Sequence, residues 1–306
     1  MKRSRLLCLA LLLGVVNPAL AEDFISNQCE PLVETGAQRQ DIPFDQGLLW
    51  RVSRNGAELG HIFGTIHISD TEVTTLPTPV EQALHSAEQF AMEALPEADQ
   101  MLLLSQMMFF MDGRRLNDFV DPGIYTRTVE ILADYKMGPD AVSVMKPWAA
   151  FLMMNYPPDT GEALDLVLLS IARDNNAELN GLESLAQQGE IFNQMALPQQ
   201  VQLLVDSVCH YDVVKADFIT MKELYLQRDL GGLHHHVNRY ESMGEKVYQD
   251  LMQRLIVDRN HAMVERMQGI FDKGKSFIAI GALHLGGKDG VLSLLEAQGF
   301  EISSVF

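Results

Sequence analysis

Two short stretches, Gly64-Thr-Ile-His67 and Gly281-Ala-Leu-His284, share the pattern Gly-x-x-His although they lie far apart in the chain. Each follows a short apolar run, at 59–63 and at 276–280, and runs of this kind are typical of buried strands. Each histidine is therefore expected just beyond the carboxyl end of its strand, where ligands bind in open α/β sheets. We predict that the two histidines belong to one site. The competing explanation is that two of the nine histidines follow strands by chance, as ordinary polar residues.

The sequence around these motifs predicts a mixed α/β fold. Asn55-Gly56 between two apolar runs indicates a β-hairpin, and further strands are expected at 89–93, 177–182 and 300–305. Helical patterns occupy most of the chain between about 97 and 270. We therefore predict a mainly parallel central sheet with flanking helices and a long helical middle segment.

The start of the chain has the pattern of a secretory signal peptide. Three basic residues precede an apolar stretch at 6–16, which is followed by the small-residue cleavage signal Ala19-Leu20-Ala21. That apolar stretch is short for a membrane span, so we expect a periplasmic or secreted protein with no span after cleavage. The predicted divisions are a signal peptide at 1–21 cleaved before Glu22, an N-terminal arm at 22–47 and one α/β domain at 48–306, with a helical insertion around 97–270.

Charge and cysteine content narrow the classes of partner. Cleavage removes three of the 23 Lys and Arg residues and none of the 41 Asp and Glu residues, which changes the net charge from −18 to −21. Such an acidic protein is a poor partner for nucleic acids and anionic membrane surfaces. The two cysteines that remain, Cys29 and Cys209, predict a disulfide in an oxidising compartment, with two separate buried thiols as the alternative. Two cysteines are too few for a thiolate metal cluster.

Two further stretches each allow two interpretations. The apolar stretch Met101–Met111 favours a core helix, and the alternative is an adaptable methionine-rich surface for an apolar peptide. The run His234–His236, which follows two glycines, favours a solvated loop, and the alternative is an accessory metal-binding tract. Neither stretch is included in the predicted site.

The residues that could carry chemistry are His67, Glu93 and His284. Two imidazoles and one carboxylate are typical ligands of Zn²⁺, Mn²⁺ or Co²⁺. A metal with an open position lowers the pKa of bound water to about 7 and polarises a carbonyl, which is hydrolase chemistry. Glu93 could instead act as the base that activates water, and without a metal a histidine could be the general base.

These residues resemble the motifs of the TraB/GumN family, which includes the Tiki metalloproteases. The resemblance covers about 48–306. The matching residues are Gly64-Thr-Ile-His67 with Ser69-Asp70, Glu93, Gly161 with Asp165, Gly181-Leu-Glu183-Ser184 with Gln187 or Gln188, Arg259-Asn260, and Gly281-Ala-Leu-His284-Leu-Gly-Gly287.

The resemblance implies a fold related to the erythromycin esterase and ChaN-like group, with a site built from His67, Glu93 and His284. It also implies metal-dependent proteolysis, with Mn²⁺ or Co²⁺ preferred. Arg259 is expected to hold a carboxylate of the substrate or of the metal site, or else to form a plain structural ion pair. Asp165 lies farther from Gly161 than the family pattern leads us to expect, so we interpret Asp165 and Glu183 as supporting or helix-end groups.

The sequence therefore predicts an exported metal-dependent hydrolase that cleaves peptide bonds in a peptide or protein substrate. The alternative is a non-catalytic periplasmic protein that uses the same histidines to bind haem or a metal, with the methionines near Met111 lining a haem pocket.

Overall fold

The sheet begins with the predicted hairpin. In the computed structural model, which describes residues 29–158 and 161–306, strands β1 (Leu49–Arg54) and β2 (Ala57–Thr65) pair antiparallel. Between them Asn55 and Gly56 have φ angles of 54° and 72°, as the two central residues of a tight hairpin turn require. The predicted signal peptide at 1–21 lies outside the described residues.

Six strands form one mixed sheet in the order β4-β3-β5-β2-β1-β6. The four strands β4, β3, β5 and β2 run parallel, and β1 is antiparallel to both β2 and β6. The prediction of a mixed, mainly parallel α/β fold is confirmed. The remaining strands are β3 (Gln89–Ala94), β4 (Glu178–Glu183), β5 (Ser276–Gly281) and β6 (Glu301–Ser304).

Strand β5 is central although it is nearly the last strand in the chain. It pairs with β2 on one side and with β3 on the other, with Thr65 opposite Gly281 and Met92 opposite Ala279. Its apolar side chains are buried, and Phe277 stacks on Phe90 of β3. The carboxyl ends of β2, β5 and β3 therefore lie side by side at one edge of the sheet.

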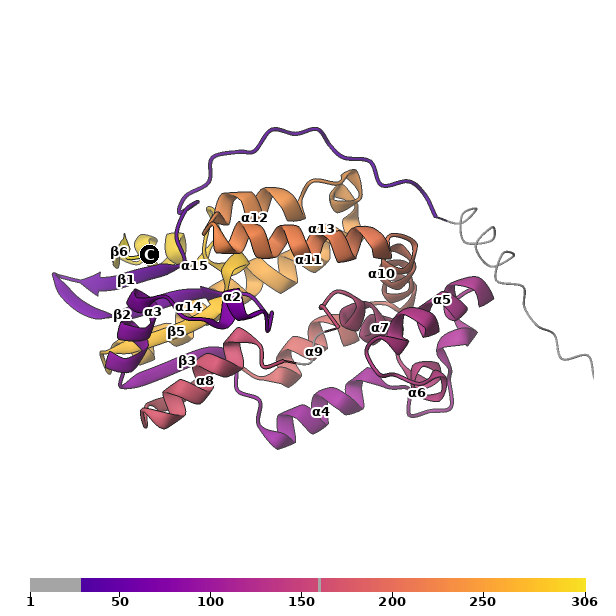
Figure 1. Ribbon diagram of the computed structural model, residues 1–306, viewed down its shortest axis with the longest axis horizontal. Helices are drawn as coiled ribbons and strands as arrows, with labels where there is room; N and C mark the ends of the chain where they lie inside the picture. The colour runs from indigo at the N-terminus through magenta and orange to yellow at the C-terminus, as the bar shows by residue number, and fades with distance from the viewer. Residues whose placement is uncertain (1–28, 159–160) are drawn as a thin grey trace, which may run out of the picture.

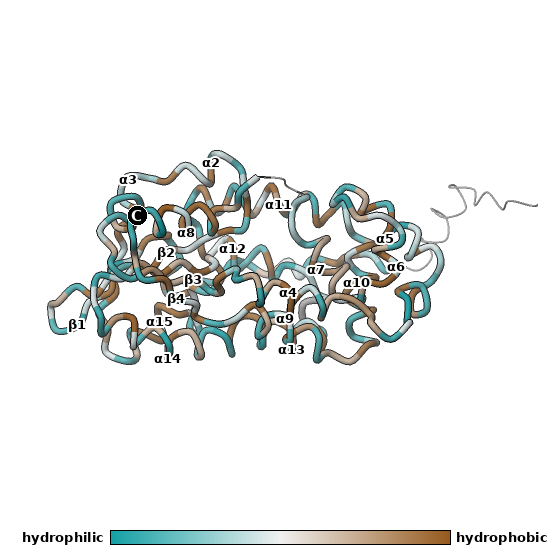
Figure 2. The backbone as a smooth tube through the Cα atoms, turned by 90° about the horizontal axis from the view of Figure 1, so that it is seen from below, coloured by the Kyte–Doolittle hydropathy of each residue, from teal (hydrophilic) through white to brown (hydrophobic). Residues whose placement is uncertain are grey.

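Helices cover both faces of the sheet, as Figure 2 shows from below, where α2, α3 and α8 lie on one side of the strands and α14 and α15 on the other. Their side chains and those of the strands form one hydrophobic core. The bounds of these helices are α2 (Thr71–Thr74), α3 (Thr78–Ser86), α8 (Leu164–Asp174), α14 (Arg259–Phe271) and α15 (Val291–Ala297).

The long helical middle segment forms a second half with its own core, beside the sheet (Figure 1). Trp148 and Phe192 stack there, with their ring centroids 5.7 Å apart. The range 97–270 also contains β4, α8 and most of α14, which belong to the sheet half, and α12 (Leu230–Val237), whose Leu230 and Leu233 are part of the sheet core. The other elements are α4 (Ala98–Met108), α5 (Pro122–Ala133), α6 (Pro139–Val144), α7 (Pro147–Met154), α9 (Leu185–Asn193), α10 (Leu197–Cys209), α11 (Tyr211–Leu226) and α13 (Lys246–Met252), with a π-helical stretch at Gln253–Asp258 and 3-10 turns at Leu116–Asp118 and Glu241–Gly244.

The prediction of a helix within Met101–Met111 is confirmed as far as Met108, but the prediction that this helix lies in the core is wrong. Helix α4 has no buried residue, and Leu102 is 59% and Met111 82% exposed. Leu104, Met107, Met108 and Phe109 pack partly against the second core, and Phe110, beyond the helix, is buried. An apolar sequence by itself does not reveal whether another element covers it, and here α4 lies at the edge of the molecule (Figure 1).

The prediction of a loop at His234–His236 is also wrong, because these residues belong to α12. Asp229 caps this helix by accepting a hydrogen bond from the backbone N–H of Gly232. A Cβ at Gly231 would lie 2.4 Å from the guanidinium of Arg39. The glycines therefore permit close packing of the N-terminal arm on the helix instead of interrupting the helix.

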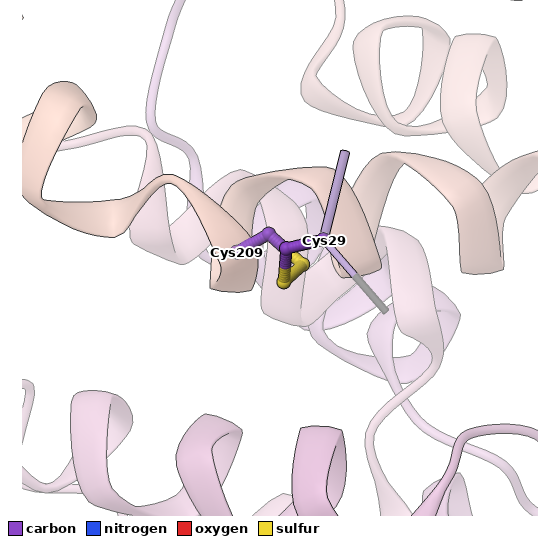
Figure 3. The surroundings of a disulfide bond; sticks show 2 residues. All are labelled: Cys29 and Cys209. Carbon is purple, nitrogen blue, oxygen red and sulfur yellow. A yellow bond between two sulfur atoms is a disulfide. The ribbon is translucent and has the colours of Figure 1, made fainter. Parts of the chain in front are cut away.

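The predicted disulfide between Cys29 and Cys209 is present, with the two Cα atoms 5.5 Å apart at the end of α10 (Figure 3). From there the arm crosses to the sheet half (Figure 1), where the carbonyl of Pro43 accepts a hydrogen bond from the backbone N–H of Gly287. The arm thus connects both halves. Among the described residues, no helix has the length and apolar character needed to cross a membrane.

Replacing both Cys29 and Cys209 with Ser is expected to lower the free energy of unfolding by about 2–4 kcal/mol. The disulfide closes a loop spanning 180 positions, for which chain entropy sets a ceiling of about 5 kcal/mol. Urea denaturation followed by circular dichroism measures the change. A reducing agent should destabilise the wild type and leave the double variant unchanged, and an unaltered midpoint in the variant would contradict the prediction.

Candidate active site

The four predicted site residues meet in one cleft of about 590 Å³ between the sheet and the helical half. His67 follows β2, Glu93 is in β3, and His284 ends a short 3-10 turn (Ala282–His284) directly after β5. Arg259 reaches them from the start of α14. Because β2, β5 and β3 are neighbours, the two Gly-x-x-His motifs lie at the same edge of the sheet.

The glycine of the first motif permits this arrangement. A Cβ at Gly64 would lie 2.6 Å from Leu285 and 3.3 Å from the backbone of Ala282. Both distances are shorter than ordinary van der Waals contacts. The end of the Leu285 side chain could turn away, but the backbone of Ala282, in the turn that carries His284, would have to shift slightly away from β2.

The imidazole of His67 is held by a carboxylate. Its Nδ1 is 2.7 Å from Asp165 Oδ2, and the other carboxylate oxygen accepts a hydrogen bond of 2.7 Å from the Thr65 hydroxyl. Asp165 lies in the first turn of α8 and is buried, whereas the His67 side chain is 41% exposed in the cleft. With Nδ1 engaged, Nε2 is the nitrogen that remains for a ligand.

Asp165 also determines the charge of His67. Burial alone would lower the pKa of His67, but the attraction and hydrogen bond of the Asp165 carboxylate outweigh burial and raise that pKa to about 9. His67 is therefore an imidazolium at neutral pH, with a proton on Nε2.

The imidazole of His284 is held by a neutral amide instead. Its Nδ1 is 2.6 Å from Asn260 Oδ1, and the Asn260 amide nitrogen donates to the carbonyl of Asp289 at 2.8 Å. The Asn260 oxygen is thus the acceptor, which places the His284 proton on Nδ1 and leaves a lone pair on Nε2. Burial, followed by the nearby charge of Arg259, lowers the pKa of His284 to about 4 against the opposing attraction of Glu93.

Glu93 and Arg259 form a buried ion pair in the wall of the cleft. Glu93 Oε2 accepts a hydrogen bond of 2.5 Å from Arg259, and Oε1 accepts one of 2.7 Å from the backbone N–H of Gly281. Glu183 also contacts the guanidinium, at 2.9 Å from Nε, and Gln188 donates to both glutamates. Burial opposes the charge of Glu93, but His284 and Arg259 together lower its pKa to about 2.

The site does not fit a metal ion in this arrangement. Arg259 Nη1 lies 3.3 Å from Nε2 of His284, and the same guanidinium pairs with Glu93. A divalent cation at these two ligands would lie against a fixed positive charge, which costs Coulomb energy that grows as the dielectric falls. Within residues 29–158 and 161–306, no group of three or more His, Cys, Asp or Glu side chains is placed to hold a metal ion.

Three residues of the cleft received little or no weight from the sequence. Asn260 entered only as the neighbour of Arg259, and Asp165 only as a supporting or helix-end group, although it determines the charge of His67. Tyr156, whose ring centroid is 5.9 Å from that of His67, carries no sequence signal because it follows a helix in the other half of the molecule. Its ring partner His67 could be found from the sequence, because it belongs to a Gly-x-x-His motif.

The family profile of TraB/PrgY/gumN proteins matches residues 48–304. The chain belongs to the TraB/PrgY/gumN family. The matched region starts where β1 begins and ends with β6, so it contains the whole sheet, the helical half and every residue of the cleft. This confirms the family resemblance expected from the motifs. No curated protein and no solved structure shows a significant match.

Replacing Asp165 with Asn is expected to lower the pKa of His67 from about 9 to below its ordinary value. Burial then acts without the Asp165 carboxylate, and the smaller attraction of Glu93 is opposed by the charge of Arg259. Because the His67 pKa is raised on folding, the Asp165–His67 pair stabilises the folded protein fully below pH 6.5, the pKa of His67 in the unfolded chain. This stabilisation is lost as the pH rises through about 9, the pKa in the folded protein. The advantage in unfolding free energy of the wild type over the variant should therefore shrink between about pH 6 and about pH 10.

Histidine NMR titration and urea denaturation measure the two effects. Asp174→Asn is the matched control, because Asp174 is an exposed residue at the other end of the same helix. An unshifted His67 titration in Asp165→Asn would show that the carboxylate does not control the imidazole.

Proposed function

We propose that this protein is a hydrolase that cleaves peptide bonds, or related amide and ester bonds, with His67 and His284 as an acid–base pair. The observation that carries the proposal is the difference between the two Nδ1 partners, a carboxylate for His67 and a neutral amide for His284. One histidine is thereby held protonated and the other neutral. Two titratable groups with pKa values driven apart in one cleft are characteristic of acid–base catalysis.

In the proposed reaction, water displaces the 3.3 Å hydrogen bond that Arg259 Nη1 donates to Nε2 of His284. This Nε2 then accepts a proton from that water as the water oxygen attacks the carbonyl carbon. Glu93 Oε1, 3.7 Å from that nitrogen, stabilises the imidazolium that forms. When the tetrahedral intermediate collapses, the carbon–nitrogen bond breaks and Nε2 of His67 gives its proton to the leaving nitrogen. His284 then releases its proton to solvent and His67 takes one up, so that only water is consumed.

The wall of the cleft favours apolar substrates. Beyond the polar residues at the sheet edge, most of the lining side chains are aliphatic or aromatic, and they come from both halves of the molecule. They include Leu104, Phe151, Leu166, Phe192, Leu255 and Ile256. We therefore propose a peptide or protein substrate with apolar side chains next to the scissile bond. The disulfide supports the proposed location, periplasmic or secreted.

A metal-dependent form of the same hydrolase is the second proposal, with Mn²⁺, Co²⁺ or Zn²⁺ on His67, Glu93 and His284. It is favoured by the hydrogen bonds at both Nδ1 atoms, because metal-binding imidazoles commonly donate their other nitrogen in this way. The resemblance of the motifs to those of a family that includes the Tiki metalloproteases also supports it. It requires that Arg259 moves toward Glu183 and away from the other two ligands. The haem-binding alternative has no comparable support, since Met111 is 82% exposed and does not line the cleft.

His67→Ala and His284→Ala are each expected to reduce kcat/KM for a cleaved peptide by at least about 10³-fold while leaving the fold intact. In the wild type, the rate should fall as the pH rises through about 9, where His67 loses its proton, and as the pH falls through about 4, where His284 gains one. A quenched-fluorescent peptide library at graded pH measures both. A rate that instead increases through about pH 9 would show that His67 acts as the base.

Removing divalent metal with a chelator is expected to leave kcat/KM of the wild type within about twofold, because the acid–base mechanism uses only side chains of the chain. Elemental analysis of residues 22–306 is run in parallel on the wild type and on the double variant His67→Ala/His284→Ala. About one equivalent of Mn, Co or Zn in the wild type, lost in the double variant together with activity on chelation, would replace the first proposal with the metal-dependent form.

A further inference from the structure

We propose that the Tyr156 hydroxyl is a catalytic hydrogen-bond donor, which binds the substrate carbonyl oxygen and stabilises the oxyanion that forms there. This inference rests on the proposed hydrolase function and adds a residue that neither the sequence motifs nor the acid–base pair includes. Tyr156 follows α7, so the donor comes from the helical half, whereas His67 comes from the sheet half.

The position of Tyr156 is held by its backbone. The Tyr135 hydroxyl donates a hydrogen bond of 2.6 Å to the Tyr156 carbonyl and lies 3.2 Å from the Tyr211 hydroxyl. The neighbouring Asn155 side chain donates to the Phe151 carbonyl at 2.9 Å and to Ser207 at 3.0 Å. These bonds secure the residue to the second core, although the side chain itself lines the cleft and the residue is 41% exposed.

The hydroxyl of Tyr156 is free for a ligand. It makes no hydrogen bond to any other residue in the described part of the chain, while the ring lies beside the His67 ring. Charges on Glu93, Arg259 and Asp165 act on it, which places it among the polar groups of the site. Burial, followed by Glu93, raises the pKa of Tyr156, so the hydroxyl stays protonated and can donate throughout the pH range in which the acid–base pair is active.

Most other donors in the cleft are already engaged. Arg259 donates to Glu93, Glu183, His284 and the Leu255 carbonyl. The backbone N–H of Gly281 and the side-chain amide of Gln188 donate to the glutamates. The proton on Nε2 of His67 is required by the leaving group. An oxyanion in this cleft therefore needs a further donor, and Tyr156, whose ring lies beside that of His67, has a free hydroxyl in the cleft.

Tyr156→Phe removes only the hydroxyl and is compared with Tyr125→Phe, which changes a tyrosine of the helical half that does not line the cleft. With the best-cleaved peptide of the library, Tyr156→Phe is expected to lower kcat by about 100-fold and to leave KM within about twofold, as the loss of one oxyanion donor does. The alkaline limb of the pH profile should stay where it is in the wild type, because the hydroxyl does not control the titration of His67. The control should match the wild type.

Binding of a phosphonate peptide tests the same donor without turnover, because its tetrahedral anionic group imitates the intermediate. The probe is acetyl-Leu-Leu with a phosphonate in place of the central amide, measured by calorimetry. Tyr156→Phe should weaken its binding by about the factor by which kcat falls.

The outcomes separate the two proposals. If the wild type cleaves peptides and Tyr156→Phe equals it in kcat, Tyr156 is not a donor and the hydrolase proposal stands. A shifted alkaline limb with an unchanged plateau would make Tyr156 a positioning residue for His67 and would likewise overturn the inference. If the wild type cleaves no peptide, the hydrolase proposal fails, and weaker phosphonate binding by Tyr156→Phe still supports the donor. If the wild type and Tyr156→Phe bind the phosphonate equally, or if neither binds it, the inference that Tyr156 is a donor is overturned.

Discussion

The site depends on the buried guanidinium of Arg259. It joins Glu93 of β3 to Glu183 at the end of β4, and Glu93 in turn accepts the backbone N–H of Gly281 at the end of β5. Three neighbouring strands and helix α14 are thus held together at the edge where the histidines lie. Removing one partner of such a pair leaves an unpaired buried charge, at a cost of about 3–5 kcal/mol. The same cation lies beside His284 and helps to keep its imidazole neutral.

Around this ion pair, two similar histidines take opposite states because their supports differ. Asp165 carries a charge and Asn260 does not, and each lies near the start of a helix that packs on the sheet, α8 for the first and α14 for the second. The two Gly-x-x-His motifs are therefore alike in sequence and position but differ in the residue that bonds to Nδ1 of each histidine. A structural explanation of the site has to include Asp165 and Asn260 as well as the histidines.

The cleft belongs to both halves of the molecule. The sheet half supplies the polar groups, and the helical half supplies much of the apolar wall and Tyr156. The disulfide secures the arm to α10 at one end, and at the other end Pro43 contacts Gly287, three residues after His284. The arm therefore links the disulfide, at Cys29, to the segment just after His284, through the hydrogen bond between Pro43 and Gly287.

Local patterns were sufficient for features that depend on neighbours in sequence. Asn55-Gly56 predicted the hairpin because few residue pairs accept its backbone angles, and the apolar runs predicted the strands that carry His67, Glu93 and His284. They failed for α4 and α12. The apolar α4 remains largely uncovered by the rest of the fold, and Gly231 of α12 allows contact with Arg39 where a loop was expected. A local sequence pattern does not reveal whether an element is buried or which distant segments it contacts.

The sequence by itself determined the family, the strand ends that bear the histidines and the glutamate, and the pairing of the two remaining cysteines, because each of these follows from short motifs or from residue counts. Only the tertiary structure decided which imidazole is charged, that Arg259 occupies the space beside His284 and Glu93, and that the Tyr156 ring lies beside the His67 ring. The physical reason is that charge state and hydrogen-bond partners depend on atoms a few ångströms away in space, and those atoms come from β3, β4, α7, α8 and α14, which are far apart in the chain.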